Sequence, residues 1–289
     1  MIIDAHIHLW NRLHGDDLGI DRKALSWGKA EQQGEVFYAA SPAFEDSLST
    51  YERAIAHMDW LGIDRAVVLQ EFMDGKQDDY LVEVRKLHPT RFSCMALLDK
   101  HYFNDPLGCF RKAIDQGGLQ GFLVRTPGAP VGKVGVPALL TFWEACAERG
   151  LPIMLKNGLP SDIKEIVKAA PELKIVWSHF AGHSGPPEQY RERLEMTATN
   201  PNVTIDMGGL TFRHRYPFSK CKEALHEAVQ LVGADKIAWG SDYPRPGLVA
   251  DASYKQQLEF ITVECDFLTD AQREQLLSGT ALRVYQWDA

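Results

Sequence analysis

The chain lacks the features that mark redox, secreted and membrane proteins. Its five cysteines are scattered over 289 residues without a C-x-x-C pair, which favours free thiols over a disulfide framework. No apolar run approaches the roughly 18 residues of a membrane helix. The first ten residues lack the basic and apolar segments of a secretory signal. We therefore expect a soluble cytoplasmic protein that binds no membrane.

Positive charge is also in short supply. The chain has 31 Lys and Arg against 39 Asp and Glu, a net charge of −8, which argues against a nucleic-acid-binding protein. No G-x-G-x-x-G follows the first apolar segment, so dinucleotide binding is disfavoured. We expect a small anionic molecule as the substrate, bound by local cations, and a homo-oligomer is compatible with the sequence.

Eight short apolar segments recur along the chain, and each is followed by helical sequence. They lie near 2–6, 65–70, 92–98, 119–124, 152–155, 174–177, 203–206 and 236–239. Most are continuously apolar, as in a parallel sheet that is covered on both faces. Eight β-then-α units predict a (β/α)8 TIM barrel, an α/β fold, as a single domain over 1–289. A doubly wound open sheet is the alternative.

Between the first apolar segment and the first helix lies a stretch without regular periodicity, at about 10–45. Long loops of this kind are usually functional, so we interpret it as a lid, with Trp10 and Trp27 shaping it. Asp46 or Ser47 is expected to cap the helix that follows. Near the C-terminus, Thr269 and the Gln three residues later form a capping box.

Polar side chains follow seven of the eight predicted strands. In a TIM barrel, catalytic residues come from the C-terminal ends of the strands. Residues two apart in a strand point to the same side, with Cα atoms about 6–7 Å apart, so the first two histidines can bind one cation. Three histidines and an aspartate together have the composition of a divalent-metal site. The residues are His6, His8, Glu71, Asp99, Arg125, Lys156, His179 and Asp242.

Four motifs resemble the amidohydrolase superfamily. They are H-x-H at 6–8, S-H-F-A-G at 178–182, G-S-D-Y-P at 240–244 and G-T-A-x-R-x-Y at 279–285. The chain is most similar to the branch that contains sugar lactonases, dicarboxylate lactonases and aminocarboxymuconate semialdehyde decarboxylase. The combination of motifs spans the whole chain, whereas each motif alone would be weak.

This resemblance implies a role for each matching residue. His6 and His8 would bind a divalent metal. We expect this metal to be zinc, and one ion rather than two. Asp242 would complete the ligand set and take the proton from a metal-bound water. His179 would be a further ligand or would polarise the oxygen of the substrate. A purely turn-forming Asp242 is the structural alternative.

Lys156 departs from the family pattern, because decarboxylases and many hydrolases of the superfamily have His after the fifth strand. Lys156 could bind an anionic group of the substrate, could be carboxylated and bridge two metals, or could repel a metal altogether. We favour substrate binding, which places the hydrolase interpretation above the decarboxylase one.

Three further residues are candidates for substrate binding. Arg125 ends the fourth strand, and its planar guanidinium suits a carboxylate. Arg213 lies in a dense cationic patch that either recognises an anion or is simply solvated. His183 either lines the pocket or is an ordinary loop residue.

The sequence thus predicts a metal-dependent, lactonase-like hydrolase of a small ester ring that bears a carboxylate or hydroxyl group. Metal-activated water would attack the carbonyl with Asp242 as the general base. The alternative enzyme is a metal-dependent decarboxylase of an aromatic or muconate-type acid. A third hypothesis, kept open by Lys156, is a non-catalytic barrel that binds a small acid or a protein.

Overall fold

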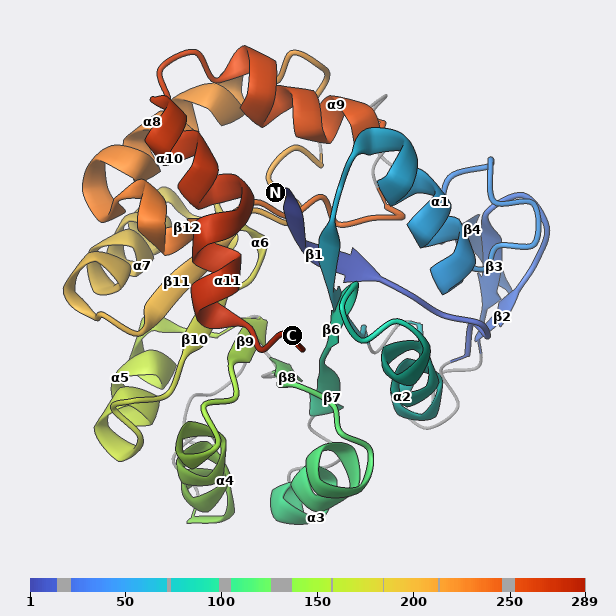
Figure 1. Cartoon of the computed structure of the whole chain (residues 1–289), viewed down its shortest axis with the longest axis horizontal. Helices are drawn as coiled ribbons and strands as arrows, with labels where there is room; N and C mark the ends of the chain where they lie inside the picture. The colour runs from blue at the N-terminus through green and yellow to red at the C-terminus, as the bar shows by residue number, and fades with distance from the viewer. Residues whose placement is uncertain are drawn as a thin grey trace.

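Parallel strands of the computed structural model form where the sequence predicts them, and they close into a barrel (Figure 1). The structure describes residues 1–14, 22–71, 74–98, 105–125, 137–156, 158–183, 185–212, 214–245 and 253–288. One run of strands has the order β1 (Ile3–His8), β5 (Arg65–Leu69) and β6 (Phe92–Cys94). The other has the order β7 (Ala96–Leu98), β8 (Phe122–Arg125), β9 (Ile153–Lys156), β10 (Ile175–Trp177), β11 (Val203–Asp206) and β12 (Ile237–Ala238).

Two joins make the sheet continuous. The expected strand 92–98 is split into β6 and β7 at Met95, whose N–H donates to the carbonyl of Val68 at 2.9 Å. At the other join, the Ala5 N–H donates to the carbonyl of Trp239 at 2.8 Å, which connects β1 to the segment after β12. The predicted (β/α)8 barrel is therefore confirmed.

Helices surround the barrel on its outside (Figure 1). They are α1 (Tyr51–Leu61), α2 (Asp78–Leu87), α3 (Pro106–Phe110), α4 (Pro137–Glu148), α5 (Pro160–Ala169), α7 (Pro187–Thr199), α8 (Ser219–Val232), α9 (Tyr254–Glu259), α10 (Asp270–Glu274) and α11 (Thr280–Val284). π-Helical segments at Arg111–Gln116, Phe260–Glu264 and Gln275–Gly279 extend α3, α9 and α10, and a 3₁₀ turn (Ala234–Lys236) precedes β12. None of the helices in the described ranges is both long and apolar enough to span a bilayer.

The caps of the helices were predicted with mixed success. The capping box at Thr269 is confirmed, because its hydroxyl accepts from the backbone N–H of Gln272 at 3.2 Å. The expected cap at Asp46 or Ser47 is wrong, since α1 begins after Thr50. Ser47 has a left-handed φ of 59° and donates its hydroxyl to the carbonyl of Leu25 instead.

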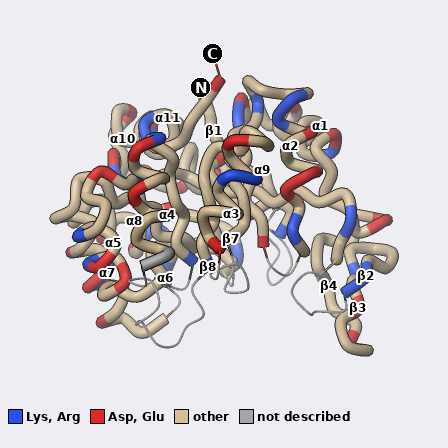
Figure 2. The backbone as a smooth tube through the Cα atoms, turned by 90° about the horizontal axis from the view of Figure 1, so that it is seen from below, with Lys and Arg blue, Asp and Glu red and all other residues tan. Residues whose placement is uncertain are grey.

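Apolar side chains form two clusters. One fills the interior of the barrel with alternate residues of the strands, such as Val67 and Met154, and with Tyr285 from the C-terminal segment. The larger cluster lies between the strands and the helices, and it contains the buried side chains of Trp177 and Trp239. Both chain termini lie at one end of the barrel (Figure 2). Because β1 starts at that end, the C-terminal ends of the parallel strands face the opposite end.

The stretch predicted as irregular contains a small antiparallel sheet beside α1 (Figure 1). Its strands are β2 (Arg22–Ala24), β3 (Lys29–Gln32) and β4 (Glu35–Tyr38). The prediction failed because the strands are only three or four residues long and β2 and β3 are mostly polar. Gln33 and Gly34, both with positive φ, form the two-residue hairpin turn between β3 and β4. Trp10 is buried, but Trp27 is 56% exposed.

Candidate metal centre

A β-bulge in β1 sets the direction of its histidines. Between Asp4 and Ile7, β1 contains one residue more than the paired segment of β5. Ala5 belongs to the interior cluster, whereas Ile7 packs in the outer one. With regular pairing these two residues would share the interior face, so the extra residue reverses the alternation. As a result, His6 and His8 both face the interior at the C-terminal end of the strand.

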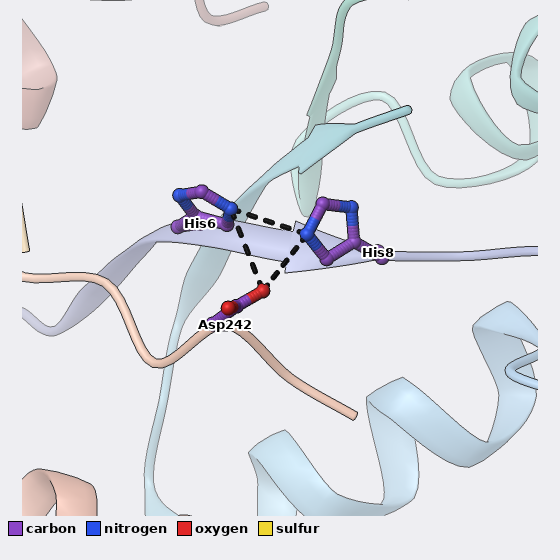
Figure 3. Close-up of side chains that lie close together, drawn as sticks. All are labelled: His6, His8 and Asp242. Atoms are coloured by element: carbon purple, nitrogen blue, oxygen red, sulfur yellow. Dashed lines mark hydrogen bonds and ion pairs between the residues drawn. The ribbon is translucent and has the colours of Figure 1, made fainter. Parts of the chain in front are cut away.

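His6, His8 and Asp242 converge at this end of the barrel (Figure 3). The two Nε2 atoms lie 3.1 Å apart. Oδ1 of Asp242 lies 2.9 Å from His8 Nε2 and 3.6 Å from His6 Nε2. All three side chains are at most 2% exposed. The structure thus brings together three residues that the sequence predicted as a metal site, and their role as ligands stays a prediction.

The remaining ring nitrogens show how the two histidines are protonated. His6 Nδ1 lies 2.7 Å from Asp206 Oδ2, and His8 Nδ1 lies 3.2 Å from the carbonyl of Leu69. A carboxylate and a carbonyl only accept, so both Nδ1 atoms carry a proton, and each Nε2 can offer a lone pair to a metal once its own proton is released. Three potential ligand atoms therefore face one another. Ligand atoms around tetrahedral zinc lie about 3.3 Å apart, given bonds of about 2.0–2.1 Å, so the cluster fits a divalent ion.

The G-S-D sequence around Asp242 has a physical reason at each position. A Cβ on Gly240 would lie 2.6 Å from His6 Cβ, so only glycine leaves room for that histidine. Asp4 accepts from the backbone N–H of Ser241 at 2.9 Å and from its hydroxyl at 2.5 Å, which anchors the turn. The Asp242 N–H then donates to the carbonyl of His6 at 2.9 Å. Although burial raises the pKa of Asp242, its hydrogen bond to His8 and the nearby imidazoles hold it well below the usual range.

Two buried ion pairs lie beside the triad. The Lys156 ammonium contacts Oε1 of Glu71, and Arg245 Nη2 donates to both oxygens of Asp74 at 2.8 Å. Burial lowers the pKa of Lys156 to about 8, against the opposing effect of the Asp242 carboxylate. From the sequence, Glu71 was predicted at this end of the barrel, whereas Asp74 and Arg245 were given no role. The position of Arg245, directly after the G-S-D-Y-P motif, was the one available signal.

Arg125 and Lys156 are neighbours across β8 and β9, where their backbones pair in register. Leu123 and Met154, two residues earlier, face the barrel interior, so both cationic side chains leave their strands on that same face. They therefore reach the mouth of the barrel together, and their role in binding an anion stays a prediction.

The other predicted site residues have varied outcomes. The ring of His183 packs against Tyr190 with centroids 5.0 Å apart, and its role as a pocket residue stays a prediction. Asp99 and Arg213, with the loop that follows Arg125, lie outside the described residues. Asp206, which sequence analysis missed, could have been recognised as the last residue of its strand.

His179 starts an unusual turn, labelled α6 (His179–Gly182). His179, Phe180 and Ala181 have φ values of 53°, 51° and 52°, and Gly182 has 71°, so all four residues are left-handed. For residues with a Cβ, this conformation costs roughly 1–2 kcal/mol each. The His179 ring lies 5.5 Å from that of His6. Burial, followed by the charge of Lys156, holds the pKa of His179 well below the usual range, so its imidazole is neutral at neutral pH.

Comparisons with known proteins agree with this architecture. The amidohydrolase family model matches residues 3–287, while no curated protein matches the sequence. An amidohydrolase from Burkholderia multivorans with bound zinc has a TM-score of 0.72 and 18% identity over 100% of both chains. A putative 2-pyrone-4,6-dicarboxylic acid hydrolase from Pseudomonas putida has a TM-score of 0.67 and 20% identity, over 97% of this chain and 95% of that chain. A 5-carboxyvanillate decarboxylase from Sphingomonas paucimobilis has a TM-score of 0.60 and 16% identity, over 83% of this chain and 84% of that one.

At such identities the structural matches establish the fold alone. The family model, in contrast, covers nearly the whole chain and includes all four motifs that suggested the resemblance. The chain therefore belongs to the amidohydrolase family, a family of barrel enzymes.

Proposed function

We propose that the protein is a lactonase that opens a small cyclic ester bearing a carboxylate, with one zinc ion held by His6, His8 and Asp242. The observation that supports this most is the buried set of three potential ligand atoms beside a cationic lysine. The similar fold of a putative pyrone dicarboxylate hydrolase is consistent with such a substrate. A divalent ion, when bound, acts as a Lewis acid and lowers the pKa of water from about 15.7 to about 7.

The protein's own groups would move the protons and stabilise the charge. Asp242 is ionised, so it can accept a proton from the attacking water and return it to the leaving oxygen. His179 is neutral, so it can donate an N–H hydrogen bond to the carbonyl oxygen as negative charge develops there. Because both groups are in place before the reaction, little reorganisation is required.

Cationic side chains would bind the carboxylate of the substrate. Lys156 and Arg125 are adjacent and reach the mouth of the barrel, and Lys156 carries its charge below pH about 8. Arg213 and His183 remain proposed as further substrate contacts. In this arrangement the reacting carbonyl lies at the triad and the anionic group lies toward β8 and β9.

The environment of Lys156 favours one metal ion rather than two. A bridging lysine would have to carry a carbamate, which is anionic. Here the amine contacts the carboxylate of Glu71, and the Asp242 carboxylate is also close enough to influence its pKa. These carboxylates would repel a further negative group at this position, whereas they attract the ammonium.

Decarboxylation of an aromatic or muconate-type acid is the second candidate. The barrel is also similar to that of a 5-carboxyvanillate decarboxylase, and Asp242 could deliver a proton to a ring carbon. The non-catalytic alternative is disfavoured because the chain belongs to a family of enzymes.

A pH-indicator screen separates these reactions. Opening a lactone near neutral pH releases a proton, whereas decarboxylation consumes one. We expect acidification with a carboxylate-bearing lactone, together with close to one zinc per chain by elemental analysis after zinc-supplemented expression. Alkalinisation with aromatic acids would support the second candidate, and protein that takes up no zinc, manganese or iron would refute the metal site.

A further inference from the structure

The left-handed turn at 179–182 needs an external support. Three of its four residues carry a Cβ and are rarely found in this conformation consecutively. Some of its hydrogen bonds, such as that from the His183 N–H to the carbonyl of Phe180 at 3.0 Å, stay within the segment, and the backbone N–H of His179 donates to Asp206 Oδ2 at 3.3 Å. The direction of the His179 ring therefore depends on contacts from other elements.

Arg193, on α7, makes such a contact. Its Nη1 donates to the carbonyl of Ala181, and its Nη2 donates to the carbonyl of Gly158, each at 3.1 Å. The guanidinium also lies over the ring of Trp177, 5.4 Å from the centroid. A Cβ on Gly182 would lie 2.3 Å from Nη1, so the turn leaves space for this side chain.

From these contacts we infer that Arg193 is a positioning residue, which holds His179 in place by joining the left-handed turn to the loop after β9. The planar fork of arginine is required, because two different nitrogens donate to carbonyls on two different loops. A lysine has one ammonium on a flexible stem and cannot replace this geometry. The expected effect on turnover rests on the role proposed for His179, whereas the effect on its position does not.

A cavity next to the Arg193 guanidinium allows the inference to be tested. It has a volume of about 250 Å³, and its walls include His179, Gly182, Gln189 and Arg193. Removing the Arg193 side chain would enlarge this space beside the two orphaned carbonyls. Free guanidinium could then enter and donate to the same oxygens.

The primary experiment measures the position of His179 directly. The full chain is labelled with ¹³Cε1-histidine, and the His179 signal is assigned by its loss in His179→Asn. We expect Arg193→Ala to shift this signal and guanidinium chloride, well below denaturing concentrations, to return it toward the wild-type position. Sodium chloride at the same ionic strength should have no such effect.

Two variants serve as controls. Arg191→Ala removes an exposed arginine of the same helix that pairs with Glu227 at 3.1 Å, and it should leave the signal unchanged. Arg193→Lys keeps the charge and most of the stem over Trp177, so it remains informative if the alanine variant does not fold. It should show the same shift without rescue, because the lysine stem occupies the space.

Turnover provides the second readout. A misplacement of about 1 Å can cost around a hundredfold in rate, so Arg193→Ala should lower kcat by about ten- to a hundredfold with little change in KM. In the His179→Asn background the same change should have almost no further effect.

An unmoved His179 signal, or equal losses in both backgrounds, would overturn the inference. A shifted and rescued signal in a protein that opens no lactone would leave the inference intact and refute the proposed function alone.

Discussion

The metal side and the cationic side of the barrel mouth are built by different means. On the metal side, His6 and His8 lie on one strand, and Asp242 follows the strand that closes the barrel against it. On the cationic side, Lys156 and Arg245 take their partners from a loop after β5, far away in sequence. The first arrangement is set by strand geometry and the second by charge pairing across the mouth. The two sides should therefore respond differently to mutation.

The largest effect is expected from Asp242→Asn, which removes both the proposed anionic ligand and the proposed proton acceptor. Loss of general base catalysis alone costs about 10²–10⁴-fold, so kcat/KM for the accepted lactone should fall by at least that amount. Steady-state turnover and zinc content measure it. Asp266→Asn, which removes a carboxylate that is 77% exposed, should change neither quantity. Full activity of the Asp242 variant would refute the proposed mechanism.

A mutation on the cationic side should instead lower the free energy of unfolding. Asp74→Asn leaves the Arg245 guanidinium buried without its carboxylate, and breaking a buried pair costs about 3–5 kcal/mol. Urea unfolding should show a loss of this size, while zinc affinity of the folded variant stays close to wild type. The exposed pair of Lys255 and Glu259 offers a control, since Glu259→Gln should change stability by less than about 1 kcal/mol. A variant with normal stability and weak zinc binding would contradict the distinction between the two sides.

A smaller effect on the metal side is expected from Asp206→Asn. The carboxylate accepts from His6 Nδ1, and removing such a partner lowers metal affinity by about 10–100-fold. Competition with a chromophoric chelator measures it. Asp235→Asn, on an exposed turn, should bind zinc as the wild type does. Equal affinities in the two variants would show that His6 does not need this hydrogen bond.

The smallest effect is expected from pH. The pKa of Lys156 is lowered to about 8 from 10.5, so its charge is present below that value and is lost as the pH rises through it. KM for a carboxylate-bearing lactone should therefore increase above pH about 8, by at most about tenfold per pH unit. In Lys156→Gln, KM should be higher and should show no such increase. An identical pH profile in both proteins would exclude Lys156 from substrate binding.

Sequence patterns predicted the parts of this molecule that depend on local regularity. The eight apolar segments indicated the barrel, and the spacing of His6 and His8 placed both on one face. The small sheet of β2–β4 was not predicted, because its strands are very short and two of them are mostly polar. Its Gln-Gly turn is not a strong signal either. The bulge in β1 could not be predicted, because an extra residue in one strand is recognised only when the register of its partner strand is known.

Long-range pairing explains the remaining omissions. Asp206, Arg245 and Arg193 act through partners between about 12 and 200 residues away, and a single sequence contains no record of such contacts. The left-handed turn after β10 was missed for a related reason. Its conformation contradicts the intrinsic preference of Phe180 and Ala181, so only the surrounding contacts can impose it.

The carboxylate of Asp206 positions two residues of the site, His6 and His179, at once. One carboxylate oxygen accepts from His6 Nδ1 at 2.7 Å and from the backbone N–H of His179 at 3.3 Å. If different elements held the two groups in place, the fluctuations of those elements would add up in the distance between the groups. Here a proposed metal ligand and the proposed oxyanion donor both contact the same oxygen, so a movement of β11 would carry them together. The spacing between the two rings can then stay constant even while the loops around them fluctuate.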